Sequence, residues 1–403
     1  MSEEAKLSVE RIAAAPEIAR ACAEIRATDA ITLADMRAAA LIPSPPFGER
    51  ARGEWFSRRI REAGMSDVEC DEVGNVIARW PGASASAPVV IAAHLDTIFP
   101  SDTSLHVSEV DGRVLAPGIG DNARGLAVIL TLSRAIAAAK LSLMRPLVVA
   151  ATVGEEGEGD LHGVKHLFSG ENGFSRASAF IAIDGAGSRR IVVRSVGSRR
   201  YRITMSGPGG HSWSDRGIVN PADALALAIA RIHRIRLPSE PAWAVTVARI
   251  GGGTSVNSIP ASAWLDLDVR AESAELLTRL VERVQTIVRD AASEVSAVRR
   301  KGSAALRVVI DTIGDRPAAA IAADAPLVSL ARAATRAIGE RPELVASSTD
   351  ANVPMALGIP SIAIGGGGES GGTHTLGEWY VNERGPDGIV RALLLVAGAA
   401  GLA

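Results

Sequence analysis

The chain has 403 residues, of which 47% are hydrophobic, and its 43 basic residues nearly balance its 45 acidic residues. This length is sufficient for two or three domains with large cores, and the even charge lacks the clustered basic face of a nucleic-acid-binding protein. The two cysteines, Cys22 and Cys70, are too few for a disulfide framework and are typical of a reducing compartment.

The ends of the chain do not have the sequence pattern of a secreted or membrane protein. The N-terminus reads Met1-Ser2-Glu3-Glu4, which is acidic where a signal peptide is basic. The longest apolar run, residues 392–403, is too short to span a bilayer. We therefore expect a cytoplasmic protein that has neither a membrane nor a nucleic acid as its partner.

Short apolar runs alternate with helical patterns in the first part of the chain and again near its end. The runs show no polar alternation, which indicates a sheet that is covered on both faces. We predict an α/β fold with a mostly parallel central sheet and flanking helices, whose sites form beyond the carboxyl ends of the strands. In chain order, the runs and helical patterns are 88–93, 122–139, 147–153, 180–183, 325–338 and 361–364.

The middle of the chain has a different pattern. Residues 263–270 alternate strictly between apolar and polar, which predicts a strand with one buried face. Further strands are expected at 201–205 and 306–311, and helices from Asn220-Pro221 and over about 273–298. This order predicts a small α+β domain inserted into a larger one. We place the insertion at 198–314, within a discontinuous catalytic domain formed by 1–197 and 315–403.

The first candidate for chemistry is His94-Leu95-Asp96, at the end of a predicted strand. Residues two apart on a strand share a face. The carboxylate of Asp96 can therefore accept one imidazole N–H and fix the tautomer that binds a metal. A strand-end histidine that is simply hydrogen-bonded to its neighbour explains the pair equally well.

Further candidates follow other predicted strands or glycines, and each has an ordinary alternative. Asp121, just before a helix, can be a helix cap. Glu155 and Glu156 can divide metal binding and proton transfer between them, or can form a solvated acidic turn. Asp184 ends an apolar strand, where a carboxylate needs a partner or a cation. His374 follows Gly371-Gly372, which allow a close approach of the backbone to a ligand.

Taken together, these side chains form a complete ligand set for two metal ions. His94, Asp121 and Asp184 can serve one ion. Asp121, Glu156 and His374 can serve the other, so that one carboxylate bridges. Such pairs of ions bind and activate the attacking and developing oxygens of a hydrolytic reaction. Ligands of these types suit zinc, and manganese and cobalt accept them as well.

The sequence resembles the co-catalytic zinc peptidases that include peptidase T, carboxypeptidase G, aminoacylase and succinyl-diaminopimelate desuccinylase. The resemblance covers nearly the whole chain and implies a zinc-exopeptidase type of fold with an inserted lid and dimerisation domain. The family often has Gly-Gly where this chain has Ser347-Ser348, before Thr349-Asp350, and this departure bears on the substrate pocket. The motifs are A-A-H-L-D-T at 92–97, G-I-G-D-N at 118–122, G-E-E-G at 154–157, G-P-G-G-H-S at 207–212, G-G-T-S-V-N-S-I-P at 252–260 and G-G-T-H at 371–374.

The resemblance assigns a role to each candidate in the catalytic domain. His94 and Asp184 would bind one metal, Glu156 and His374 the other, and Asp121 would bridge them. Asp96 would orient His94. Glu155 would be the general base that activates a metal-bridging water and then protonates the leaving nitrogen, a division of labour that agrees with general acid–base chemistry. The resemblance also implies a cis peptide bond between Asp121 and Asn122.

In the inserted domain, the resemblance implies three further site residues. His211 would stabilise the oxyanion, and Asn257 and Arg270 would contact the substrate, with Arg270 suited to a carboxylate. An ion pair of Arg270 with Asp268 or Asp266 is the alternative. Dimeric relatives imply that His211 reaches the active site of a partner chain, so we expect a homodimer that forms through this domain.

We therefore expect a hydrolase that uses two divalent metal ions to cleave an amide-type C–N bond in a small peptide or an N-acyl amino acid. A related hydrolase of a non-peptide C–N bond, such as a deaminase or a catabolic amidase, would have the same metal site. A non-enzymatic binding protein with this fold is a third reading, and the intact ligand set with Glu155 present argues against it.

Overall fold

The computed structural model describes residues 3–170, 174–237 and 239–403. The chain divides into two compact units, one formed by Met1–Ser195 with Ala320–Ala403 and the other by Val196–Ala319. The sequence analysis placed the boundaries of the expected inserted domain at 198 and 314; the two units are called the catalytic unit and the inserted unit below. None of the described helices is long and apolar enough to cross a membrane.

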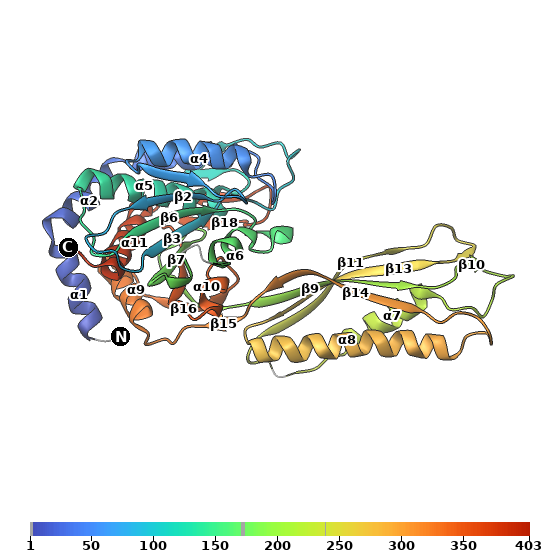
Figure 1. The fold of residues 1–403 in the computed structure, drawn as a ribbon. Coiled ribbons are helices and arrows are strands. Elements are labelled where there is room, and N and C mark those ends of the chain that lie inside the picture. The colour runs from blue at the N-terminus through green and yellow to red at the C-terminus, as the bar shows by residue number, and fades with distance from the viewer. Residues whose placement is uncertain (1–2, 171–173, 238) are drawn as a thin grey trace. The chain divides into compact units, whose positions relative to one another are not determined.

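The catalytic unit is built on a nine-stranded sheet in the described residues, shown in Figure 1. Its four central strands, β6, β3, β7 and β17, are parallel neighbours, so their carboxyl ends lie at one edge of the sheet. In spatial order the strands are β1 (Asp67–Cys70), β2 (Val76–Trp80), β6 (Leu147–Thr152), β3 (Val89–His94), β7 (Ala179–Ile183), β17 (Ser361–Ile364), β8 (Arg190–Ser195) and β15 (Ala319–Ala320), and β16 (Glu343–Ser347) pairs with β8.

Alternate residues of the central strands face two separate hydrophobic cores. In β3, for example, Val89 and Ile91 belong to one core, and Val90 and Ala92 belong to the other. This arrangement explains why these strands are apolar without alternation. The prediction of a mostly parallel α/β sheet with flanking helices is confirmed. Helices α1 (Glu3–Ala14), α2 (Pro16–Ala27), α3 (Asp29–Ala40), α4 (Arg50–Glu62), α5 (Gly125–Ala139), α9 (Pro326–Ala337) and α11 (Gly385–Ala400) contribute to the first core, and α6 (His162–Phe168) and α10 (Asn352–Ala356) contribute to the second.

A smaller four-stranded sheet supports the loops around the carboxyl edge. It consists of β18 (Glu369–Gly371), β19 (Trp379–Val381), β5 (Arg113–Leu115) and β4 (Ser108–Val110). Pairing of β19 with β5 brings the segment before β19 next to the segment after β5. That second segment leads into a short irregular helix, η1 (Ile119–Arg124), which is not regular at Asp121 and Asn122. The helix that we expected from 122 therefore begins only at Gly125. Two single turns, η2 (Gly157–Gly159) and η3 (Phe174–Arg176), complete this unit.

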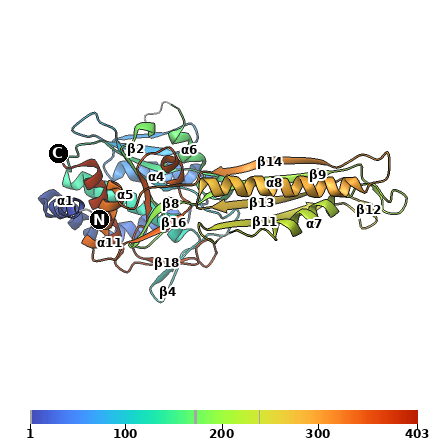
Figure 2. The ribbon, with the colours of Figure 1, turned by 90° about the horizontal axis from the view of Figure 1, so that it is seen from below.

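The inserted unit is an antiparallel sheet with two helices along one face, as Figures 1 and 2 show. Asn220 caps the first helix by accepting a hydrogen bond from the backbone N–H of Ala222, as its sequence predicts. Ser273 caps the second helix. In spatial order the strands are β11 (Trp243–Gly252), β13 (Ser262–Ala271), β9 (Gly197–Ser206) and β14 (Arg307–Arg316); the helices are α7 (Pro221–Ile232) and α8 (Ala274–Ala297), and a short ladder joins β10 (Gly210–His211) to β12 (Ser258–Ile259).

Candidate metal centre

His94 closes the buried strand β3 and is itself buried. Its Nδ1 lies 3.0 Å from the backbone oxygen of Asp96 and 3.5 Å from the Oδ1 atom of the same residue. Its Nε2 lies 3.0 Å from Oδ1 of Asp121. When Nδ1 donates its proton to the Asp96 carbonyl, Nε2 can donate to Asp121 in the protonated ring, or can offer its lone pair to a metal ion in the neutral ring. The nearer acceptor is thus the backbone of Asp96, whereas the sequence suggested its carboxylate.

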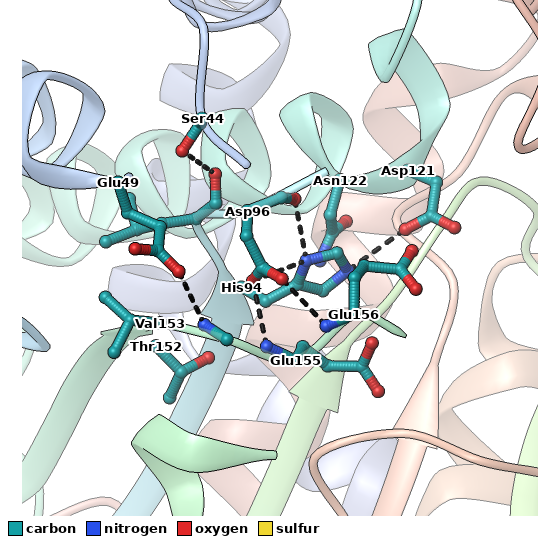
Figure 3. A network of polar contacts seen from close by, with 12 residues as sticks. Ser44, Glu49, His94, Asp96, Asp121, Asn122, Thr152, Val153, Glu155 and Glu156 are labelled. Atoms are coloured by element: carbon teal, nitrogen blue, oxygen red, sulfur yellow. Dashed lines mark hydrogen bonds and ion pairs between the residues drawn. The ribbon is translucent and has the colours of Figure 1, made fainter. Parts of the chain in front are cut away.

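The Asp96 carboxylate holds the turn that carries the two glutamates (Figure 3). Its two oxygens accept the backbone N–H groups of Glu155 at 2.9 Å and Glu156 at 2.7 Å. Glu49 accepts the N–H of Gly154 at 2.9 Å. Glu155 and Glu156 are only 5% and 8% exposed, so the alternative of a solvated acidic turn is wrong. Asp96 therefore fixes the His94 end of β3 and the adjacent glutamate turn together.

Asp121 lies between the two histidines of the candidate set. Its Oδ1 faces His94, and its Oδ2 lies 3.3 Å from Nε2 of His374. The same His374 nitrogen lies 2.8 Å from Oε1 of Glu156. The backbone of His374 has a φ of 66°, just after Gly372 with a φ of 70°. The Asp121–Asn122 peptide bond is cis, as the resemblance implied.

Asp184 follows β7 directly and completes the group. One ligand atom each from His94, Asp121 and Asp184 lie within 4.8 Å of one another. Burial raises the pKa of Asp184 to about 7, and the negative charges of Asp121 and Glu156 add to this effect. A carboxylate in this position is stabilised as an anion only when positive charge is supplied nearby.

The histidines supply positive charge in the metal-free site. Hydrogen bonds to Asp121 and Glu156 raise the pKa of His374 to about 10. Burial alone would lower the pKa of His94, but Asp121 and Asp96 outweigh it and raise that pKa well above its usual range. Burial opposes ionisation of Asp121, yet His374 and His94 lower its pKa. Metal ions can take the place of these imidazole protons, since metal binding releases protons from its ligands.

The side chains fit two divalent ions that share one carboxylate. One group of ligand atoms comes from His94, Asp121 and Asp184, and a second comes from Asp121, Glu156 and His374, each within 4.8 Å. Three protein ligands for each ion leave coordination positions open, as in catalytic metal sites. A third group with the same spacing includes Glu155, which therefore lies beside the candidate ligands His94 and Glu156.

Glu378 is a supporting residue that the sequence analysis missed. It is fully buried, and its carboxylate accepts three backbone N–H groups, from Gly118 at 2.9 Å, Gly120 at 2.8 Å and Asp121 at 2.9 Å. Burial raises the pKa of Glu378 to about 7, and the three N–H donors oppose this by favouring the ionised form. Its position four residues after His374 carries no periodicity signal, because the role depends on the pairing of β19 with β5.

In the inserted unit, the structure brings two of the three expected site residues together. The backbone oxygen of Asn257 accepts the N–H of Ser212, next to His211. Nδ1 of His211 accepts the N–H groups of Trp213 and Ser214 at 3.2 and 3.4 Å, so its neutral form carries the proton on Nε2. The imidazole is exposed and can donate from that nitrogen.

Arg270 lies apart from these two residues. It is near the far end of β13, about 26 Å along the strand from Ser262, at about 3.3 Å per residue. There it pairs with Ser198, close to the point where the chain enters the inserted unit. Its Nε lies 2.7 Å from Oδ2 of Asp268. The ion pair that the sequence offered as an alternative is therefore present.

The chain is similar to known peptidases in sequence and in fold. Residues 90–397 match the model of Peptidase family M20/M25/M40. The cytosol non-specific dipeptidase of Escherichia coli (strain K12) is 26% identical over 317 residues, which are 70% of this chain and 60% of that protein. This chain thus spans about three-fifths of the length of that curated relative.

Two solved structures illustrate the likeness of the fold. The aminopeptidase PepT from Bacillus cereus has a TM-score of 0.73 at 21% identity, over 92% of this chain and 98% of that one. A dinuclear metal binding peptidase from Bacillus subtilis has a TM-score of 0.68 at 17% identity, over 94% of this chain and 100% of that one.

Proposed function

Because the chain belongs to peptidase family M20/M25/M40, we propose that it is a dinuclear metallohydrolase that cleaves an amide-type C–N bond in a small peptide or an N-acyl amino acid. The observation that carries the proposal is the shared carboxylate: Asp121 lies at 3.0 Å from one histidine and 3.3 Å from the other. A further carboxylate lies beside each histidine: Asp184 beside His94, and Glu156 beside His374. This arrangement has little use in a binding protein without metals.

The proposed ligands are His94 and Asp184 for one ion, Glu156 and His374 for the other, and Asp121 for both. When bound, the two ions would lower the pKa of a water molecule and polarise the scissile carbonyl. Zinc suits these ligands, and manganese or cobalt would serve the same residues. Asp96 and Glu378 position the ligands through the backbone contacts described above.

Glu155 is the proposed general base and acid. Its carboxylate lies within 4.8 Å of ligand atoms of His94 and Glu156, and its backbone N–H is fixed by Asp96. In this position it accepts a proton from the attacking water and delivers it to the leaving nitrogen. The adjacent Glu156 is assigned to metal binding because it contacts His374.

The inserted unit is proposed to complete the site. His211 donates from Nε2 to the developing oxyanion, a role that its hydrogen-bonded Nδ1 favours. Asn257, beside it, and Arg270 contact the substrate. We propose a cytoplasmic homodimer, assembled through the inserted unit, in which His211 and Asn257 serve the partner's site. His211 and Asn257 lie beyond the Ser262 end of β13, whereas Arg270 lies near its other end. This separation supports a model in which the two groups of residues serve different active sites.

Metal removal tests the function. Purified protein should contain about two divalent ions per chain, and a chelator should abolish hydrolysis of dipeptides or N-acyl amino acids. His94→Ala and His374→Ala should each lose at least one ion, because each removes the only imidazole from one group of ligands. His106→Ala, an exposed histidine outside these groups, is the control. Full activity in metal-free protein would contradict the proposal, and turnover of only non-peptide C–N substrates would favour the alternative reading.

A further inference from the structure

A small cavity opens beside the candidate metal centre on the side of Asp184. It has a volume of about 60 Å³, and Asp184, Arg190, Ser347 and Thr349 contribute to its lining. All of its lining residues belong to the catalytic unit. The cavity has room for a few water molecules or one carboxylate, but not for a large side chain.

Sheet topology places Arg190 at the same edge as the candidate metal ligands. Strand β17 is parallel to β7, with Ile364 opposite Ile183, and Asp184 follows directly. Strand β8 runs antiparallel to β17, with Ile364 also opposite Ile191. Arg190 is the first residue of β8 and therefore lies just beyond the carboxyl end of β17. An arginine here is at the site edge of the sheet because of strand order, which its sequence position does not reveal.

The guanidinium of Arg190 has no partner among the described residues. Its neighbour Arg189 forms an ion pair with Glu343. Arg391 binds the backbone oxygen of Arg190 at 2.7 Å, which fixes the main chain and leaves the Arg190 side chain free. Arg270, the arginine expected to bind a substrate carboxylate, is already paired with Asp268. The N–H groups of the Arg190 guanidinium are therefore available to form two parallel hydrogen bonds to a planar anion such as a carboxylate.

A threonine in the lining of the cavity complements the arginine. The Thr349 hydroxyl oxygen accepts the N–H of Ala351 at 3.1 Å, which leaves its O–H able to donate. Ser347 also contributes to the lining, but it pairs with Ser195 at the opposite end of β8 from Arg190, so the subsite is not assigned to it. A carboxylate in the cavity would meet the guanidinium together with the hydroxyl group of Thr349.

We propose that Arg190, with Thr349, forms a subsite that binds a carboxylate of the substrate on the Asp184 side of the metal centre. The inference rests on the proposed function, because it concerns the substrate of that hydrolysis. The carboxylate has two chemical sources: the free C-terminus of a peptide or N-acyl amino acid, or an acidic acyl group. Either would bind by bidentate hydrogen bonds to Arg190.

Paired substrates test this subsite and separate the two sources. Ala-Leu is compared with Ala-Leu amide, and N-succinyl-leucine with N-butyryl-leucine, using the metal-loaded wild type and Arg190→Gln. We expect Arg190→Gln to lower kcat/KM by about 10–100-fold, mainly through KM, for the substrate that supplies the carboxylate. Its neutral counterpart should be cleaved equally by both proteins. Arg190→Lys should restore part of the loss, since lysine keeps the charge without the bidentate geometry.

The control is Arg189→Gln, which removes the adjacent arginine that does not line the cavity. It should leave both substrate ratios unchanged. Calorimetric binding of leucine and of succinate to the metal-loaded proteins provides a readout that does not depend on turnover. We expect weaker binding of one of these two carboxylates to Arg190→Gln than to wild type.

The outcomes separate the two proposals. If Arg190→Gln matches wild type in both substrate pairs and in carboxylate binding, the subsite is disproved while the hydrolase function stands. If metal-loaded wild type cleaves no amide substrate, the proposed function fails, and the calorimetric comparison still decides whether Arg190 binds a carboxylate.

Discussion

Two aspartates of the candidate centre show how neighbours decide the charge of the same side chain. Both are drawn toward the neutral form by burial. Asp121 contacts His94 and His374, and its pKa falls. Asp184 faces other carboxylates, and its pKa rises to about 7. Opposite pKa shifts of two carboxyl groups that lie close together in space are typical of sites that hold cations or move protons.

At the same scale, Glu155 can be tested without disturbing the ligands. Glu155→Gln keeps the size of the side chain and the backbone N–H that binds Asp96. It should lower kcat by about 10²–10⁴-fold, the range typical of general acid–base catalysis. Metal content should remain at about two ions per chain. Near-normal turnover with full metal content would show that another residue is the base.

The elements around the centre are joined by buried polar side chains. Arg124 is fully buried and donates to the backbone oxygens of Gly366 at 2.7 Å and Gly385 at 2.8 Å. Arg52 donates to the backbone oxygens of Leu95 at 2.9 Å and Ile42 at 2.6 Å. Loops at the edge of a sheet leave many carbonyl groups without ladder partners, and such groups are costly when buried. These arginines therefore fix the loops that carry the candidate ligands.

Glu378 is the matching anchor for backbone N–H groups, and it links the segment before β19 to η1. Glu378→Gln replaces one acceptor oxygen by an NH₂ group, which would face a backbone N–H of the Gly118–Asp121 loop. We expect a loss of about 10–100-fold in metal affinity, as for other residues that orient metal ligands. Titration against a competing chelator measures this directly.

The control for Glu378 is Glu369→Gln, an exposed glutamate on β18. It should keep the metal affinity of the wild type. The melting temperature, Tm, of both metal-free variants separates a positioning role from a general loss of stability. Wild-type metal affinity in Glu378→Gln would rule out the positioning role.

At the scale of the whole molecule, the candidate residues of the inserted unit lie on two different sheets. His211 lies on the short β10–β12 ladder, and Arg270 lies near the start of β9. Strand β11 is an edge strand of ten residues with many exposed positions. Exposed edges invite pairing with another chain. A symmetric dimer through this unit would use that edge and the polar face of the sheet.

Subunit mixing tests the dimer and the role of His211. Glu155→Gln and His211→Ala should each be nearly inactive alone. After co-refolding in equal amounts, random two-fold pairing makes about half of the dimers mixed. Each mixed dimer contains one intact site if His211 acts across the interface, so activity should recover to about a quarter of wild type. If mixed dimers form but hydrolytic activity does not recover, or if a monomer is fully active, His211 does not act across a dimer interface.

Local patterns in the sequence were sufficient to predict many of the strands and helices and the candidate metal ligands. Apolar runs without alternation predicted the two-sided sheet, because each strand carries that information in its own residues. Strict alternation in 263–270 and the cap at Asn220 likewise predicted elements of the inserted unit. Motifs at strand ends identified the candidate ligands, since parallel strands deliver their carboxyl ends to one edge.

The tertiary structure alone decided which side chains meet. His94 and His374 are 280 positions apart in the sequence, yet Asp121 lies between their imidazoles. Glu378 reaches the Gly118–Asp121 loop through the pairing of β19 with β5, and Arg190 reaches the Asp184 cavity through the order of β7, β17 and β8. Such contacts depend on the order of strands and on burial, which are properties of the whole chain. The sequence determines which side chains are available for the candidate site. The packing of the sheets determines which of these side chains meet and which of them are charged.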